Sequence, residues 1–232
     1  MYNNKKILAV ITARGGSKRL ANKNILDLDG KPLIVWSIDE ANKSKYIDKI
    51  IVTTDSKEIS EISKVAGAEV PFLRPSLLAS DNADTFSVLK HSIEFYKGLY
   101  DYVILLQPTS PLRTVFHIDS AIELLNEKTK AVVSVCEVDH SPLWSNTLPE
   151  NMSMKDFIRK SVKNIRSQDL PKYYRLNGAV YISEINYFYL EEGFLGPRSK
   201  AFLMSQLSSI DIDTELDFNM CEFIINKKNK NF

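Results

Sequence analysis

Short apolar runs that alternate with helix-patterned segments most restrict how this chain of 232 residues can fold. Four apolar runs are typical of strands that are buried on both faces of a sheet. They are residues 7–12 (ILAVIT), 49–54 (KIIVTT), 102–107 (YVILLQ) and 131–138 (AVVSVCEV). Repeated strand–helix–strand units require right-handed crossovers, which make the connected strands parallel. The pattern therefore predicts an α/β domain with a mostly parallel sheet.

Helix signals follow these strands. Pro32 suits the first turn of a helix over residues 33–44. Asp55 is placed to begin the next helix, because Glu58 stands three residues later in the spacing of a capping box. Further helices are predicted at 86–96 and 117–127.

The strand–helix rhythm stops over residues 140–172, where proline, serine, methionine and charged residues follow no sustained period. We interpret this segment as an arm or hairpin that interrupts a single domain spanning residues 1–232. Strand patterns return at 178–183 (GAVYIS) and 200–204 (KAFLM). A last helix is predicted from Thr214, with one apolar face made by Leu216, Met220, Phe223 and Ile224.

Charge and composition argue against several classes of protein. A formal net charge of +1 gives no electrostatic reason to expect binding to nucleic acid or to a membrane surface. The apolar runs are too short to cross a bilayer. Cys136 and Cys221 form no metal-binding or disulfide pattern, so a reducing cytoplasm is the expected compartment.

The segment ARGGSKRLANKN, residues 13–24, follows the first predicted strand directly. Ligands of parallel sheets bind beyond the carboxyl ends of the strands. Glycines there let backbone N–H groups approach phosphate oxygens, and Arg14, Lys18 and Lys23 supply charge. The alternative is a solvated basic turn. The spacing matches neither GxxxxGK[ST] nor GxGxxG, which argues against a P-loop ATPase and a dinucleotide-dependent dehydrogenase.

A second candidate is the acidic segment SIDIDTELD, residues 209–217. Asp211 and Asp213 flank Ile212, so both carboxylates face the same side of an extended chain. Mg²⁺ takes one or two carboxylates and leaves its other positions to water and phosphate oxygens. The alternative is helix capping, with Asp213 or Thr214 at the start of the last helix.

Taken with the basic loop, several motifs occur in an order that resembles the acylneuraminate cytidylyltransferases. They are TTDS (53–56), LRP (73–75), LQPTSPLR (106–113), RLNGAVYI (175–182) and SIDIDTELD (209–217). The resemblance implies a Rossmann-like, three-layer α/β fold and a homodimer that exchanges the arm. It also implies a Mg²⁺-dependent reaction in which CTP activates a nine-carbon 2-keto-3-deoxy acid sugar, giving the CMP-sugar and pyrophosphate.

The resemblance assigns roles to individual residues. The catalytic residues it implies are Arg14, Lys23 and Asp211. The implied metal ligands are Asp211 and Asp213. The implied nucleotide-binding residues are Ala13, Gly15, Gly16, Ser17, Lys18, Asn22, Asn24, Arg74 and Ser80. The implied sugar-binding residues are Gln107, Arg166, Tyr181 and Phe194, with Arg166 reaching the acid from the neighbouring subunit.

Several alternatives stay open at this point. Arg74 is also interpreted as a loop brace, Arg113 as a helix-start residue, and Tyr181 and Phe194 as ordinary core. Arg19 stands where sialic acid enzymes usually have glycine, which favours legionaminic over sialic acid slightly. Pseudaminic acid and Kdo cytidylyltransferases are the next alternatives. A nucleotide-sugar-dependent glycosyltransferase is disfavoured because QPTSP, rather than an acidic DxD, follows the mid-domain strand.

Overall fold

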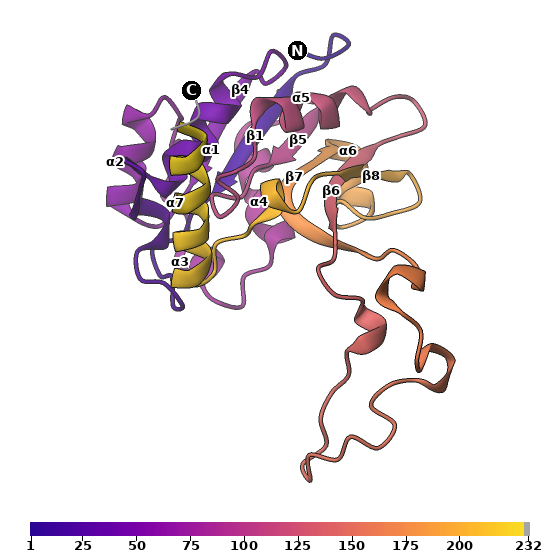
Figure 1. Ribbon diagram of the computed structural model, residues 1–232. Helices are drawn as coiled ribbons and strands as arrows, with labels where there is room; N and C mark the ends of the chain where they lie inside the picture. The colour runs from indigo at the N-terminus through magenta and orange to yellow at the C-terminus, as the bar shows by residue number, and fades with distance from the viewer. Residues whose placement is uncertain (230–232) are drawn as a thin grey trace.

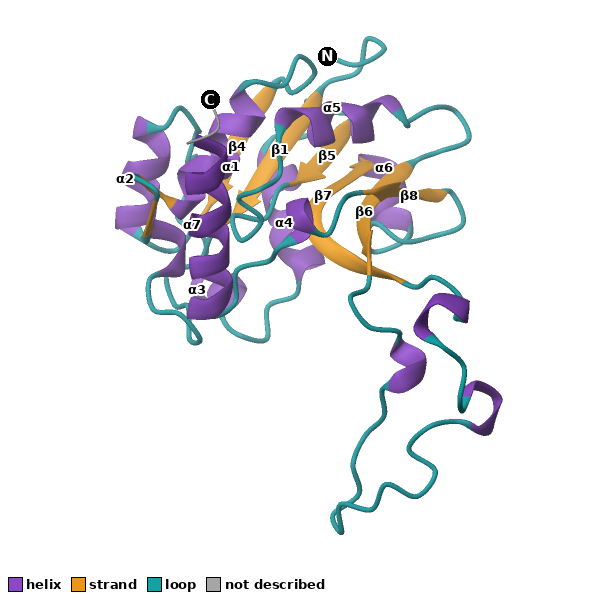
Figure 2. Ribbon diagram, in the orientation of Figure 1, coloured by secondary structure: helices purple, strands orange, loops and turns teal. Residues whose placement is uncertain are grey.

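The computed structural model describes residues 1–229 and contains a six-stranded sheet in the order β4-β1-β5-β7-β6-β8. Figures 1 and 2 show this sheet at the centre of the molecule with helices on both faces. The strands are β1 (Ile7–Thr12), β4 (Lys49–Thr53), β5 (Tyr102–Leu105), β6 (Ala131–Glu137), β7 (Tyr174–Glu184) and β8 (Ser199–Leu203), and a separate antiparallel pair is formed by β2 (Asp27–Leu28) and β3 (Lys31–Pro32).

Strand directions agree with the prediction at most positions. β1 pairs in parallel with β4 and β5, and β6 pairs in parallel with β8. The exception is β7, which runs antiparallel to both of its neighbours, β5 and β6. The mostly parallel sheet is confirmed, with one reversed strand that the apolar pattern did not reveal.

Side-chain alternation along β1 explains the three layers. Ile7, Ala9 and Ile11 point into one core cluster, which also contains residues of α1 (Leu33–Asn42) and α5 (Val115–Glu123). Leu8 and Val10 point into a second cluster on the other face, with residues of α4 (Thr85–Phe95) and α6 (Ile185–Leu190). Because both faces are covered, the strand is apolar at every position from Ile7 to Ile11.

Two helix starts differ from the predictions. Ser56, rather than Asp55, caps α2 (Lys57–Val65), because its hydroxyl accepts the N–H of Ile59. The helix expected from residue 117 begins two residues earlier, after Thr114. Hydroxyl caps at both places satisfy N–H groups that would otherwise lack a partner. Between α2 and α4 lies one short helix, α3 (Ser76–Ala79).

The apolar face predicted for the last helix is wrong at three of its four residues, and only Ile224 packs against the core. In α7 (Glu215–Asn229), Leu216 is 68% exposed, Met220 46% and Phe223 67%. The helix instead turns Cys221 and Ile225 toward the core. Apolar residues lie on both sides of this helix, so their spacing alone could not select the buried side. The helix also continues into the polar segment 226–232 as far as residue 229.

The segment predicted as an arm leaves the sheet between β6 and β7. It holds only short 3₁₀ helices, at Pro142–Trp144, Lys160–Val162 and Ser167–Asp169. Figure 1 shows this stretch projecting away from the body of the molecule. Glu137 and Tyr174 pair where the two legs of the arm meet the sheet. The arm is therefore the extended tip of the antiparallel β6–β7 connection.

Within residues 1–229, the structure contains no helix with the length and apolar character needed to cross a bilayer.

Candidate active site

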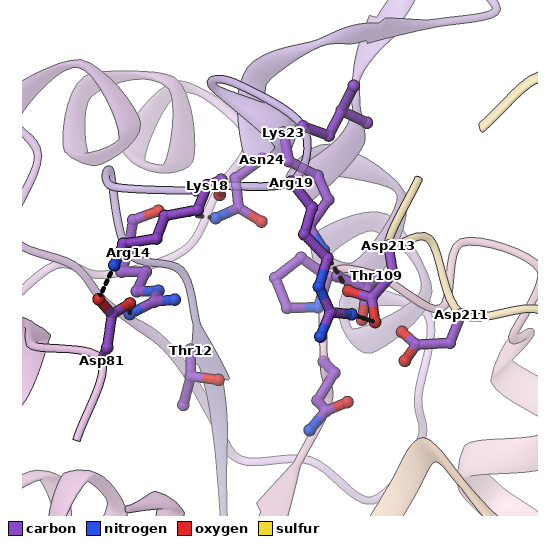
Figure 3. A pocket seen from close by; sticks show the side chains of 14 residues that line it. Thr12, Arg14, Lys18, Arg19, Lys23, Asn24, Asp81, Thr109, Asp211 and Asp213 are labelled. Carbon is purple, nitrogen blue, oxygen red and sulfur yellow. Dashed lines mark hydrogen bonds and ion pairs between the residues drawn. The ribbon is translucent and has the colours of Figure 1, made fainter. Parts of the chain in front are cut away.

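A pocket of about 500 Å³ lies at the carboxyl ends of β1 and β5. It brings the basic loop and the acidic segment together, although they are separated by most of the chain (Figure 3). Its lining consists of Thr12, Arg14, Ser17, Lys18, Arg19, Leu20, Lys23, Asn24, Asp81, Gln107, Pro108, Thr109, Asp211 and Asp213.

Three hydrogen bonds hold the basic loop in place. The N–H of Ala13 donates to the Thr53 carbonyl at 3.1 Å, which prolongs the β1–β4 pairing by one residue. The N–H of Gly15 donates to Asp55 Oδ1 at 2.9 Å, and Asn24 Nδ2 donates to the Arg14 carbonyl at 2.9 Å. Asp55, expected as a helix cap, therefore anchors the loop. The Gly15 N–H, expected to meet a phosphate, is already bonded.

The cations of the loop pair with two carboxylates. Arg14 Nη1 lies 2.8 Å from Asp81 Oδ1, and Lys18 Nζ lies 2.5 Å from Asp81 Oδ2. Arg19 Nη1 lies 2.7 Å from Asp213 Oδ2, and Lys23 Nζ lies 3.0 Å from Asp213 Oδ1. Figure 3 shows the two groups on opposite sides of the pocket. The pocket is thus lined by four cations whose charges are partly balanced by carboxylates.

Lys23 is the direct link between the two segments. Its ammonium donates to the Ile212 carbonyl at 2.6 Å as well as to Asp213. The side chain is only 13% exposed, which limits screening by water. One nearly buried cation therefore fixes the position of the acidic segment against the loop.

Asp211 has an unsatisfied carboxylate oxygen. Its Oδ1 is buried and has no hydrogen-bond partner among the residues that the structure describes. Burial raises the pKa of this carboxyl, a hydrogen bond from the Thr109 side chain opposes the rise, and the charge of Asp213 adds to it. A buried carboxylate oxygen without a donor is costly unless a cation or proton meets it.

The start of α7 is capped by Thr214 and Asp217, and the carboxylate of Asp213 takes no part in the capping. Thr214 Oγ1 accepts the N–H of Asp217, and Asp217 Oδ2 accepts the N–H groups of Thr214 and Asp213. The carboxylate of Asp213 does not cap α7, since it faces Arg19 and Lys23. Capping and a site in the pocket are therefore served by different residues of the same segment.

The two aspartates suit a magnesium ion better than a metal that needs a full set of protein ligands. No group of three or more His, Cys, Asp or Glu side chains arranged for a metal occurs in the described part of the chain. Magnesium normally keeps several waters and takes only one or two carboxylates. The free Oδ1 of Asp211 matches that requirement, whereas both oxygens of Asp213 would have to leave Arg19 and Lys23 before it could bind the ion.

A smaller pocket of about 210 Å³ adjoins the first and shares Thr12, Arg14 and Asp81 with it. Arg74 and Ser80 line this pocket. The buried guanidinium of Arg74 donates to the carbonyl and hydroxyl of Thr53 and to the Leu78 carbonyl at 3.4 Å. Burial lowers the pKa of Arg74 to about 10. Arg74 therefore braces the loop, as the alternative interpretation held, and it also lines the smaller pocket.

The side chain of Gln107 lines the main pocket and packs against Gly178. A Cβ on Gly178 would lie 2.3 Å from Gln107 Oε1, so a larger residue would displace the Gln107 side chain, and its φ of +70° also favours glycine. Arg113 Nη1 donates to the carbonyls of Gln107 at 3.1 Å and Ala179 at 3.0 Å. Arg113 is therefore a buried brace between β5 and β7, in place of the helix-start residue considered from the sequence.

The chain resembles known proteins over nearly its whole length. A family model described as Cytidylyltransferase matches residues 8–227. The chain belongs to this cytidylyltransferase family. It is 38% identical to the N-acylneuraminate cytidylyltransferase of Escherichia coli, over 97% of this chain but 53% of that protein. It is 37% identical to the CMP-N,N'-diacetyllegionaminic acid synthase of Legionella pneumophila, over 94% and 95% of the two chains.

Other relatives extend the comparison. The pseudaminic acid cytidylyltransferase of Campylobacter jejuni is 34% identical over 94% of this chain and 96% of its own. The chain thus spans about half the length of the Escherichia coli relative and nearly all of the other two. The description of the family model makes nucleotidyl transfer the chemistry of this family.

Solved structures share the fold at low sequence identity. CMP:2-keto-3-deoxy-manno-octonic acid synthetase complexed with CTP gives a TM-score of 0.71 at 16% identity, covering 96% of this chain and 99% of that chain. The 4-diphosphocytidyl-2C-methyl-D-erythritol synthase of Anaerococcus prevotii gives a TM-score of 0.65 at 16% identity, covering 96% of each chain. Both are cytidylyltransferase folds, which confirms the α/β architecture.

Some residues that the family resemblance selected lie away from the main pocket. Tyr181 and Phe194 pack against each other, with ring centroids 5.7 Å apart, in the core beneath α6. Tyr181 is only partly buried, and its hydroxyl accepts the N–H of Gly178, which lies beside Gln107. A place for the two rings on the apolar side of a sugar site stays a prediction. Asn22 is exposed, with a left-handed φ of 52° that turns the loop. Arg166 lies exposed on the arm, outside the pocket of its own chain.

The structure also adds residues that the sequence analysis did not select. Thr109 and Pro108 lie within the LQPTSPLR motif, so the motif itself was a usable signal. Thr12 is the last residue of β1, where ligand contacts of parallel sheets are expected. No local pattern marks Asp81 as a site residue, because its role comes from ion pairs with Arg14 and Lys18, which lie far from it in the sequence.

Proposed function

We propose that this chain is a Mg²⁺-dependent cytidylyltransferase that joins CMP from CTP to a nine-carbon 2-keto-3-deoxy acid sugar and releases pyrophosphate. The observation that carries the proposal is the contact of Lys23 with Ile212 and Asp213, which joins the basic loop to the acidic segment in one pocket. The names of the relatives, which specify N-acylneuraminate and N,N'-diacetyllegionaminic acid, support the class of sugar.

The two adjoining pockets suggest how the nucleotide lies. The base would occupy the smaller pocket beside Arg74 and Ser80, and the triphosphate would extend past Arg14 into the larger one. Lys18 and Lys23 then meet the β- and γ-phosphates with charge-assisted hydrogen bonds. Catalysis of such a transfer consists mainly of holding the reactants in line and stabilising the charge that develops.

Asp211 and Asp213 would hold the magnesium ion, which, when bound, offsets phosphate charge and lowers the pKa of the sugar hydroxyl. Because a carboxylate has two oxygens, Asp211 would accept the proton from that hydroxyl on one of them while the other holds the ion. Arg14 and Lys23 stabilise the negative charge on the transferred and leaving phosphates.

We place the acid sugar beside Gln107, which lines the main pocket close to Thr109. Arg19 lines the same pocket, and its difference from the usual glycine favours legionaminic over sialic acid. The relatives named for those two sugars are 37% and 38% identical to this chain, so identity does not separate them. The relative named for pseudaminic acid is 34% identical and remains the next alternative.

The proposed reaction is testable with the purified chain, CTP and Mg²⁺. We expect pyrophosphate and a CMP-sugar with N,N'-diacetyllegionaminic or sialic acid, and the higher kcat/KM with the former. Substituting UTP should reduce the rate strongly, which controls for non-specific hydrolysis. Absence of pyrophosphate with every nonulosonic acid tested would remove the proposal.

We also propose a cytoplasmic homodimer in which the arms are exchanged. Three largely exposed leucines, Leu176, Leu195 and Leu203, lie on or beside the β6–β7–β8 part of the sheet, next to an apolar groove of about 500 Å³. The arm itself exposes Met152 and Met154. Apolar surface of this kind on both elements favours burial against a second copy. In such a dimer, Arg166 would approach the pocket of the partner subunit.

Sedimentation equilibrium should show a dimer at micromolar concentration. Replacing residues 145–165 with a short Gly-Ser linker should give a monomer, because Glu137 and Tyr174 still pair at the base of the arm. The linker variant should retain its near-native circular dichroism and lose most of its turnover. A monomeric wild-type chain with full activity would contradict the exchange.

A further inference from the structure

Asp81 holds the two cations that the proposed triphosphate needs. Its Oδ1 lies 2.8 Å from Arg14 Nη1, and its Oδ2 lies 2.5 Å from Lys18 Nζ. Figure 3 shows this triad on one side of the pocket, facing Asp213 and its cations across the cleft. Each carboxylate oxygen thus pairs with a cation that the proposed triphosphate would also need.

The place of Asp81 in the fold adds to this point. Asp81 lies between α3 and α4, and it lines both the larger and the smaller pocket. An anion that extends from one pocket to the other has to pass Arg14 at this border. A carboxylate and a phosphate repel each other when they share the same cations. The triphosphate and Asp81 therefore compete for Arg14 and Lys18.

We propose that Asp81 is a displaceable counterion that sets the affinity of the cleft for polyphosphate. In the empty cleft it keeps Arg14 and Lys18 ordered, and CTP displaces it on binding. After transfer it returns to both cations and promotes release of pyrophosphate. This role rests on the proposed function, since it assumes that a triphosphate enters this cleft.

The contacts of Asp81 make displacement inexpensive. Its side chain is 45% exposed, so water can solvate the carboxylate once it leaves the cations. The N–H of Ala83 donates to the Ser80 carbonyl at 3.2 Å, which closes a turn around Asp81 without using its side chain. The capping carboxylate of Asp84 stays on α4, where it accepts the N–H of Ser87 at 2.7 Å. The carboxylate can therefore move without disturbing the start of the helix.

Asp81→Asn tests the role through binding of inorganic pyrophosphate, measured by isothermal titration calorimetry. Exposed ion pairs contribute little individually, so the loss of both competing pairs should tighten pyrophosphate binding by about three- to tenfold. CTP should bind more tightly by a similar factor. Steady-state turnover should then become limited by pyrophosphate release, which would appear as stronger product inhibition.

Asp39→Asn is the matched control. It removes one carboxylate, which pairs with Lys31 at 2.5 Å and does not line either pocket, so the change in net charge is the same. Its affinity for pyrophosphate should stay within twofold of the wild type. An Asp81→Asn variant that binds pyrophosphate no more tightly than this control would overturn the role of Asp81.

A second variant separates competition from a general effect on the fold. In a Lys18→Met background, Asp81→Asn should give a smaller gain in pyrophosphate affinity, because one of the two contested cations is already absent. An undiminished gain contradicts the proposal. If the wild type makes the CMP-sugar but Asp81→Asn binds pyrophosphate no more tightly, the role of Asp81 is refuted and the proposed function stands. If Asp81→Asn binds pyrophosphate more tightly but the wild type makes no CMP-sugar, the proposed function is refuted instead.

Discussion

Asp211→Asn should lower the kcat of CMP-sugar formation by about 10³-fold, the loss expected when a preorganised charge at a reacting centre is removed. The amide keeps the shape of the side chain but cannot bind a cation with a negative oxygen. It also cannot accept the proton of the sugar hydroxyl. The measurement is single-turnover formation of the CMP-sugar at saturating CTP and Mg²⁺.

The same variant should be at least as stable as the wild type in magnesium-free buffer. Because burial raises the pKa of Asp211 above its value in the unfolded chain, the folded state holds the proton more tightly. The ionised carboxylate therefore costs stability at pH 7, and that cost disappears as the pH falls through the raised pKa toward the unfolded value. Asn removes the cost, so the difference in Tm should narrow at low pH.

These two readouts make the result decisive. Circular dichroism melts distinguish an inactive folded enzyme from an unfolded one. Asp39→Asn, which removes a carboxylate outside the pocket, should retain near-normal turnover. Wild-type turnover by Asp211→Asn would refute both the metal role and the proton-acceptor role.

Lys23→Met should reduce kcat/KM for CTP by about 10²- to 10³-fold. The ammonium is nearly buried and donates to Ile212 and Asp213 at 2.6 and 3.0 Å. Water has little access to this position, so it cannot easily take over the lost hydrogen bonds. Methionine matches much of its length but supplies no donor. We expect both a higher KM for CTP and a lower kcat, because Lys23 binds phosphate and also fixes the acidic segment.

Lys31→Met is the control for loss of a lysine. Lys31 pairs with Asp39 and lies outside both pockets, so its replacement should change turnover by less than twofold. Lys23→Arg should recover part of the activity lost in Lys23→Met, since it restores the charge in a different shape. Equal activities in Lys23→Met and Lys31→Met would exclude Lys23 from the reaction.

Local patterns were sufficient to locate β1, β4 and β6 of the sheet. The run at 7–12 became β1 with the same bounds, and the runs at 49–54 and 131–138 became β4 and β6 with minor changes at their ends. Burial on both faces requires apolar side chains at every position, so the sequence records it directly. The basic loop was located for a related reason, since it directly follows the first of these strands.

Other elements depended on contacts that local patterns do not record. The direction of β7 follows from the antiparallel return after the arm, and an apolar strand reads the same in either direction. The buried side of α7 is chosen by its docking against Leu28 and Leu33, because the helix is apolar on more than one side. The contact between Tyr181 and Phe194 likewise depends on tertiary packing, because the two residues come from β7 and from the loop after α6.

By itself, the sequence determined the α/β class, the cationic loop after the first strand and the paired aspartates near the end, because each is written in neighbouring residues. Only the tertiary structure decided that Lys23 meets Asp213, 190 residues later, and that Asp81 meets Arg14, 67 residues earlier. Charge pairing acts over a few ångströms in space and is indifferent to separation along the chain. Folding of the sheet is what brings those side chains within that range.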